Sequence, residues 1–182
     1  GLDFAGKLAT NGIDLENGAT IVLDRASVES VNDSSIRDNR NLLDQDVAGN
    51  AVTLATGSTT AGNVKLVDEA ENAITNATTA TVKNSAGGDV VADATYNYTV
   101  AGDATGLHVG YMLRKVDVRE GKTLILDTTG ATNHEFSAEL AGKGGLAVKG
   151  DTVTLSHADN TYSGETTVAE GDLIAQAKNA LG

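Results

Sequence analysis

Side chains able to do chemistry are few in this chain, and their spacing favours no catalytic class. His108, His134 and His157 share no metal-ligand spacing, so we expect them at the surface or at corners and predict no metal site. Cysteine is absent, and neither G-x-S-x-G nor a phosphate-binding G-x-x-x-x-G-K-[ST] motif occurs. The sequence therefore predicts a protein that is not an enzyme and needs no cofactor.

Two pairs of residues leave a binding or acid/base role open. Asp44 and Asp46 would share one face of an extended strand, where they could act as a general acid/base pair or bind Ca²⁺. The stacked-coil calcium motif G-G-x-G-x-D is not met by KGGLAVKGD, so a solvated acidic loop is the favoured interpretation. Tyr96 and Tyr98 would also point the same way. They could form a sugar platform, but packing on the body of the protein is favoured.

Composition narrows the function mainly by exclusion. The 182 residues hold 13 Lys and Arg against 25 Asp and Glu, and this net charge of −12 argues against a nucleic-acid partner. No stretch approaches the roughly 18 apolar residues of a membrane helix, and the first ten residues do not resemble a signal peptide. We therefore expect a soluble piece without its own targeting signal. The lack of cysteine fits the cytosol, and equally a chain exported through an oxidising periplasm and a narrow pore.

A short pattern of glycine, a polar residue and alternating apolar residues recurs along the chain. It occurs as NGATIVL, AGNAVTL, EGKTLIL and KGDTVTL. Two pairs of glycines stand 21 positions apart, namely Gly121 with Gly142 and Gly150 with Gly171. A period of this size in strand-like sequence predicts the coils of a solenoid.

The content of Thr, Asn, Gly and Val favours strands and turns over helices. Very short strands cannot form a stable sheet alone, but stacking from coil to coil gives each backbone group a partner above and below. We therefore predict an all-β fold, a parallel β-helix with polar loop or hairpin excursions. The predicted inward column and its corners are Leu146, Val148, Val153, Leu155, Val168 and Leu173, with Gly150, Gly164 and Gly171.

Two polar stretches interrupt the period, at about residues 25–50 and 57–93. We expect them to be long loops, corners or hairpin side lobes, and part of each could be a short helix, at 66–74 or 34–43. The predicted organisation is one continuous solenoid. Residues 1–135 would form coils with these insertions, and residues 136–182 would form the last coils.

The segment 136–182 carries a specific motif. It reads FSAELAGKGGLAVKGDTVTLSHADNTYSGETTVAEGDLIAQAKNALG and resembles the passenger-associated transport repeat of bacterial autotransporters. Glu165 and Glu170 each stand where that repeat usually has one glycine of a Gly-Gly pair, so these corners differ from the family pattern. The first half of the chain is similar to such passengers only in its general character and matches no specific motif. The matching positions are Gly142, Gly144, Gly145, Leu146, Lys149, Gly150, Val153, Leu155, Asn160, Thr161, Tyr162, Gly164, Thr166, Thr167, Val168, Gly171, Leu173 and 179–182.

The resemblance implies a right-handed parallel β-helix exported to the bacterial cell surface, whose C-terminal coils fold first and help to draw out the rest. Its partners would be the remainder of its own passenger and an outer-membrane β-barrel. The implied function is a non-catalytic stalk and folding nucleus (an autochaperone-like region) of a surface adhesin. Two alternatives remain: direct adhesion, by self-association or binding of host glycans or proteins, and a polysaccharide-active β-helix enzyme.

Overall fold

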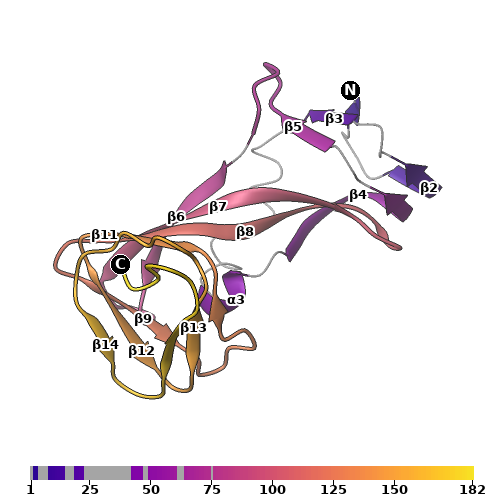
Figure 1. The fold of residues 1–182 in the computed structure, drawn as a ribbon. Helices are drawn as coiled ribbons and strands as arrows, with labels where there is room; N and C mark the ends of the chain where they lie inside the picture. The colour runs from indigo at the N-terminus through magenta and orange to yellow at the C-terminus, as the bar shows by residue number, and fades with distance from the viewer. Residues whose placement is uncertain are drawn as a thin grey trace. The chain divides into compact units, whose positions relative to one another are not determined.

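The protein is all-β, as the composition predicts (Figure 1). The computed structural model describes residues 2–3, 8–14, 19–22, 42–46, 49–60, 64–74 and 76–182. Within these ranges the one helix is a single turn, and no helix is long and apolar enough to cross a membrane. The chain forms two compact units. The first comprises Gly1–Asp33, Ala48–Thr78 and Asn97–Met112, and the second Ser34–Val47, Thr79–Tyr96 and Leu113–Gly182.

The first unit combines parallel and antiparallel strand pairs. Its strands are β1 (Leu2–Asp3), β2 (Leu8–Asp14), β3 (Ala19–Val22), β4 (Gly49–Thr60) and β5 (Val64–Val67), with parts of β6 (Asn76–Lys83), β7 (Val90–Gly102) and β8 (Gly106–Val118). Strand β3 pairs in parallel with β1 and β5, and β2 pairs in parallel with β4. Strand β4 runs antiparallel to β8. A short turn joins β7 to β8, which are neighbours in the sheet.

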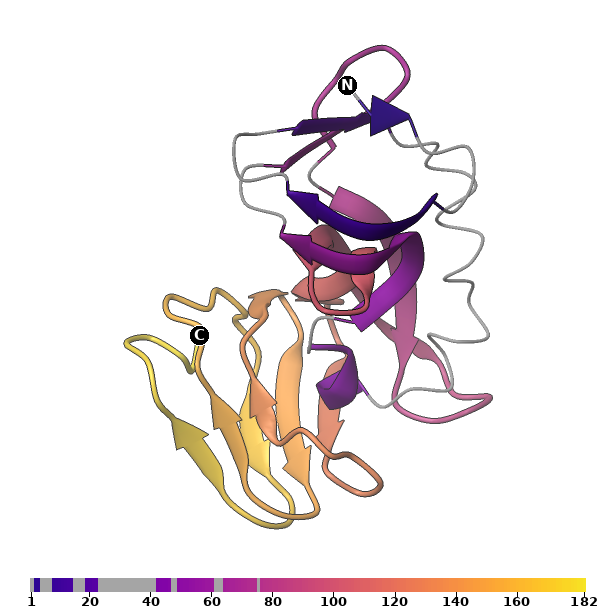
Figure 2. The ribbon, with the colours of Figure 1, turned by 90° about the vertical axis from the view of Figure 1, so that its right-hand side faces the viewer.

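The second unit contains short parallel strands that lie side by side, orange to yellow in Figure 2. Strand β12 lies between β9 and β14, and β13 lies between β10 and β15. Strand β11 pairs in parallel with β8. The elements of this unit, besides parts of β6, β7 and β8, are α3 (Leu42–Gln45), β9 (Thr123–Asp127), β10 (Glu135–Phe136), β11 (Glu139–Gly142), β12 (Gly145–Lys149), β13 (Val153–Leu155), β14 (Thr166–Val168) and β15 (Leu173–Ala175).

The register of these strands follows the repeat period. Leu124 of β9 lies opposite Leu146 of β12, which lies opposite Thr166 of β14, so the partners are 22 and then 20 residues apart. Val153 of β13 lies opposite Leu173 of β15, again 20 residues apart. Parallel pairing at this spacing places each strand against the strand one repeat further along the chain.

The two polar stretches contain more strand than expected. Within 57–93 lie the end of β4, all of β5 and β6, and the start of β7. Residues 66–74 do not form the short helix that the sequence left open, because Asp68 begins a turn in which its Oδ1 accepts hydrogen bonds from Ala70 N and Asn72 N. Of the expected helix at 34–43, only the last two residues are described, and they begin α3. Residues 25–41 and 47–48 lie outside the described part.

The antiparallel pairing of β4 with β8 also differs from the expected single parallel coil along the whole chain. The direction of β8 is set by the turn at Asp103–Thr105, which joins it to β7. A connection this short cannot cross over to make a parallel pair, so β8 returns beside β7 as a hairpin. Parallel layers 19 to 22 residues apart are found in the second unit, from β9 onward.

The register can be tested with disulfides, because the chain has no cysteine of its own. Thr154 and Ile174 lie opposite each other on β13 and β15, and both side chains are at least partly exposed. The variant Thr154→Cys with Ile174→Cys is expected to form an intramolecular disulfide on mild oxidation. Thr154→Cys with Asp172→Cys should not form one. Asp172 lies two residues before Ile174, and this offset of about 6.6 Å along the strand, combined with the interstrand spacing of about 4.8 Å, places its Cα atom beyond disulfide reach of residue 154. Equal oxidation of both pairs, measured by mass spectrometry, would contradict this register.

Candidate functional site

The sequence-predicted column lies in the second unit. Leu146 and Val148 on β12 and Val153 and Leu155 on β13 are buried. They pack between the adjacent layers, where each buried aliphatic side chain contributes about 1.5–3 kcal/mol. Two predicted members depart from the expectation: Val168 is 47% exposed and Leu173 is half-buried. They lie on β14 and β15, the last strands of their sheets in the described structure, so no strand covers their outer side.

The predicted glycine corners bring successive layers into direct contact. Gly150 and Gly171 have φ angles of 94° and 78°, in the left-handed region that favours glycine. A Cβ atom on Gly150 would lie 2.3 Å from Thr128 Oγ1, and one on Gly171 would lie 2.3 Å from the carbonyl oxygen of Asp151. At Gly164 a Cβ atom would lie 2.4 Å from the carbonyl carbon of Gly144. A side chain at any of these corners would therefore push two layers apart.

Asn160 connects three successive layers through its side chain. Its Oδ1 accepts a hydrogen bond from Leu140 N at 2.8 Å, and its Nδ2 donates to the carbonyl oxygen of Ala180 at 2.8 Å. Both partners are 20 residues away, one repeat before and one repeat after. Asn160 is only 4% exposed, so the two backbone groups that it satisfies have little access to water. The sequence motif marked this residue, but not its bridging role.

Tyr162, two residues after Asn160, is also buried. Its hydroxyl oxygen lies 2.6 Å from Thr166 Oγ1 on β14. The neighbouring Thr161 N donates to the carbonyl oxygen of Leu140 at 2.8 Å. The NTYSGETT segment is thus held at its start to the preceding layer, and an internal contact from Tyr162 to Thr166 closes its turn into β14.

Loss of the Asn160 amide should destabilise this stack. Asn160→Ala leaves the N–H of Leu140 and the carbonyl of Ala180 buried without partners, and we expect a loss of about 2–4 kcal/mol in the free energy of unfolding. Thr161→Ala is the matched control, because that side chain is exposed. Equal urea midpoints for the two variants would show that the bridge contributes nothing.

The two predicted acidic residues do not share a strand face. Asp44 lies in α3 and Asp46 directly follows it. Asp44 Oδ1 accepts hydrogen bonds from the backbone N–H groups of Thr132 and Asn133, at 2.9 and 2.8 Å, and from Thr132 Oγ1 at 2.9 Å. Asp46 Oδ2 accepts from Ser137 N at 2.5 Å and from Ser137 Oγ at 2.7 Å. The pair therefore fastens α3 to the segment that leads into and out of β10.

This geometry provides neither an acid/base pair nor a cation site. The carboxylates of Asp44 and Asp46 bind different partners, and the described residues contain no cluster of three or more side chains able to hold a metal ion. Burial raises the pKa of Asp46, while the hydrogen bonds from Ser137 oppose the rise. Its Oδ1 is buried without a hydrogen-bond partner. An ionised Asp46 is thus held at an energetic cost, and its role is structural.

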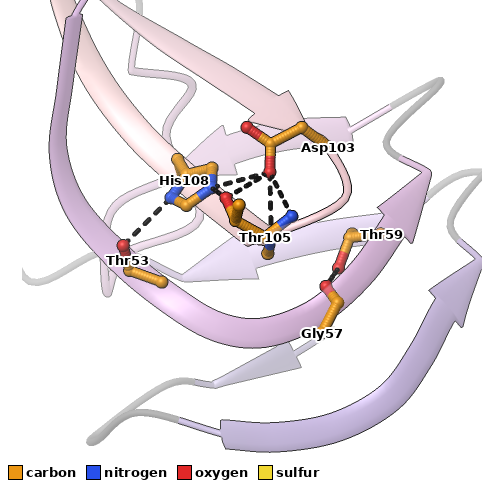
Figure 3. A network of polar contacts seen from close by, with 7 residues as sticks. Thr53, Gly57, Thr59, Asp103, Thr105 and His108 are labelled. Carbon is orange, nitrogen blue, oxygen red and sulfur yellow. Dashed lines mark hydrogen bonds and ion pairs between the residues drawn. The ribbon is translucent and has the colours of Figure 1, made fainter.

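A polar network that the sequence analysis missed lies in the first unit (Figure 3). His108, expected at the surface or a corner, is buried and lies opposite Thr53 across the β4–β8 pair. Its Nδ1 is 3.0 Å from Thr53 Oγ1, and its Nε2 is 3.1 Å from Asp103 Oδ1. His134 is exposed and His157 half-buried. The sequence signal that could have identified this network is the spacing Asp-x-Thr-Gly-x-His at residues 103–108, because Asp-x-Thr-Gly is typical of a turn closed by an aspartate.

The order hydroxyl, imidazole, carboxylate is also the order that activates a nucleophile in hydrolases. Here, however, Asp103 Oδ1 is held by the turn itself: it accepts from Thr105 N at 2.8 Å, Gly106 N at 3.0 Å and Thr105 Oγ1 at 2.5 Å. His108 Nε2 is in addition 3.0 Å from Thr105 Oγ1. These contacts fix the β7–β8 turn against β4, which is sufficient to account for the network.

These hydrogen bonds, led by those from Thr105, hold the pKa of Asp103 well below its usual range. Because the folded pKa is lowered, the network stabilises the fold above the unfolded pKa of about 3.9 and loses that effect as pH falls through the folded pKa. We expect Thr105→Val to move the titration midpoint of the Asp103 carboxyl upward. Carboxyl chemical shifts followed by NMR from about pH 7 to about pH 1 would measure this. An unchanged midpoint would exclude the Thr105 hydroxyl as the main cause.

Tyr96 and Tyr98 do not form an exposed sugar platform. Tyr96 is buried, and its hydroxyl donates to Gln45 Oε1 of α3. Tyr98 is half-buried and belongs to the other unit. Tyr96 and Gln45 line one side of a cavity of about 730 Å³ in the second unit, and β6 and β9 line other parts of it.

Two Escherichia coli K12 proteins are similar to this chain. The uncharacterized protein YuaQ is 29% identical over 180 residues, which cover 91% of this chain and 13% of YuaQ. The uncharacterized lipoprotein YdeK is 34% identical over 100 residues, 52% of this chain and 8% of YdeK. The chain thus spans a small fraction of the length of these relatives. No protein-family profile and no solved structure matches it.

Proposed function

We propose that this chain is a non-catalytic segment of a bacterial autotransporter surface adhesin. In this proposal the second unit is part of a right-handed parallel β-helix that serves as a stalk and as a folding nucleus that assists secretion. Its partners are the rest of its own passenger and an outer-membrane β-barrel. The proposal is supported by the buried column and by the hydrogen bonds between layers in residues 123–182, and it assigns no catalytic centre.

The register of the parallel strands carries the proposal. The chain leaves β9, passes through β10 and β11, and returns to pair β12 with β9 in parallel; it then passes through β13 and returns to pair β14 with β12. Strands β10, β13 and β15 follow the same rule in a second sheet. A chain that repeatedly returns to the same sheet, in parallel and after about one repeat, takes the path expected of solenoid coils, and this supports the proposal.

A folding nucleus in this region is physically reasonable, because each layer needs its neighbour. The N–H groups of Leu146 and Thr161 donate to the carbonyls of Glu165 and Leu140, in the layers after and before their own. Asn160 bridges three layers at once. A layer that docks onto a formed one gains these bonds and buries its column residues, which favours movement of an emerging chain toward the folded side.

The proposed location is the bacterial cell surface. The name of the relative YdeK, a lipoprotein, supports a place in the cell envelope. The match to two much longer proteins fits a segment of an extended passenger. The resemblance of 136–182 to the passenger-associated transport repeat supports the finer assignment.

Surface display tests the proposed role. We expect Val153→Asp or Leu155→Asp, in the chain fused ahead of an outer-membrane β-barrel in E. coli, to lower the protease-accessible fraction several-fold, because a buried unpaired charge prevents the layers from docking. Total fusion protein is measured in parallel to separate export from degradation.

Ile174→Asp is the matched control, because the same substitution falls on a side chain that is 48% exposed on the neighbouring strand. It should be displayed at the wild-type level. Wild-type display of both buried-site variants would remove the secretion-assisting role.

A further inference from the structure

Three strand segments make the first layer of the second unit, and in the described part of the chain no parallel strand precedes any of them. The layer consists of residues 115–118 of β8, of β9 and of β10, which pair with β11, β12 and β13 of the next layer. A stack of repeats is stable only when its end is capped, because the backbone groups along an open edge lack partners. The groups that close the outer edges of this layer therefore decide whether the stack can begin here.

The outer edge of β9 is closed by the side chain of Asn84, in the turn after β6. Gly145 N donates to the carbonyl of Lys122, and peptide groups along a parallel strand face alternate sides, so Thr123 O and Ile125 N face away from β12. Asn84 Nδ2 donates to Thr123 O at 2.8 Å, and its Oδ1 accepts from Ile125 N at 2.9 Å. A side-chain amide has the donor and acceptor of a peptide group, so Asn84 replaces one residue of a preceding strand.

The outer edge of β10 is closed in the same way by Asn133, together with Asp46. The carbonyls on either side of Glu135 accept from β13 and from the residue that follows it, so the Glu135 peptide groups face the other side. Asn133 Nδ2 donates to Glu135 O at 2.7 Å, and its Oδ1 accepts from Glu135 N at 3.2 Å. The next outward N–H, of Ser137, donates to Asp46 Oδ2. Asn133 Nδ2 also donates to Leu43 O of α3 at 2.7 Å, which joins α3 to this edge.

The third strand of the layer is closed by β7. Strands β7 and β8 are neighbours in the sheet, and Arg119 N, directly after β8, donates to Val91 O of β7 at 2.9 Å. The Arg119 guanidinium also holds Asp93 of β7, with Nε and Nη2 each 2.8 Å from one carboxylate oxygen. A two-point contact of this kind fixes orientation as well as position. All three outer edges are thus closed by residues of the second unit itself.

We propose that residues 42–46 and 79–96 form a cap that begins the stack of layers, so that the layers of the second unit stay folded without support from the first unit. The cap gives the folding nucleus a fixed N-terminal boundary. Its part in export rests on the proposed function, whereas the cap itself does not. In a chain that emerges with its C-terminal end first, the layers of 113–182 would form before the cap, and docking of the cap would complete the nucleus.

Hydrogen exchange of the full chain, followed by NMR, tests the independence of the layers. Ile21 is fully buried on β3, in a sheet made only of the first-unit strands β1, β3 and β5. Ile21→Asp is expected to abolish amide protection in β3 and β5, and to leave that of β9, β12 and β13 within about twofold of the wild type. Loss of protection in β12 and β13 together with the first unit would overturn the proposal. If Ile21→Asp aggregates, Ile21→Ala is measured in the same way.

The double variant Asn84→Ala with Asn133→Ala tests the cap directly. We expect the amides of Ile125 and Glu135 to exchange about three- to tenfold faster, because each loses its acceptor. The amides of β12 should lose protection at a lower urea concentration than in the wild type, whereas those of β3 and β5 should not change. Ser85→Ala, an exposed position in the same turn as Asn84, is the matched control and should behave as the wild type. A wild-type urea midpoint for β12 in the double variant would overturn the capping role.

These measurements separate the cap from the proposed function. Both use the purified chain, so they do not depend on export. Independent layers combined with wild-type display of Val153→Asp and Leu155→Asp would keep the cap and remove the secretion-assisting role. Reduced display of those variants combined with layers that unfold with the first unit would do the reverse.

Discussion

The second unit depends on hydrogen bonds between the backbones of strands about one repeat apart in sequence. Strands of three to five residues, such as β12 and β13, have no independent stability, because each lacks partners along both edges. Stacking supplies those partners and at the same time buries the aliphatic column. The glycine corners are a consequence of the same constraint, since layers at strand spacing leave no room for a Cβ atom at Gly150 or Gly171.

The sequence allowed the all-β class and the inward positions Leu146, Val148, Val153 and Leu155 to be predicted. Alternation and turn residues are local signals, and these residues obey them. Two things depend on neighbours and were not predictable from local pattern. The exposure of Val168 follows from which strand lies beyond it, and the burial of His108 follows from pairing with Thr53, 55 residues earlier in the chain.

Polar side chains hold the irregular parts of both units in place. Asp44 and Asp46 were visible in the sequence as a pair. Side chains two residues apart point to the same side of a strand but to different sides of a helical turn, so the pair does not act together. Asn160 was visible as part of a motif, whereas its partners, Leu140 and Ala180, lie 20 residues away on either side and become neighbours only in the folded chain. Patterns therefore identified several of the important residues more readily than the bonds that they make.

The spacing of about 20 residues between layers has a mechanical consequence. A layer adds only about 4.8 Å to the height of the stack, whereas the same 20 residues pulled straight reach about 65 Å. Under tension, the release of one terminal layer would thus lengthen the polypeptide by more than ten times the height that it gave up, while the remaining layers stay folded. Such a stack of layers would extend in increments under load and absorb work at each step.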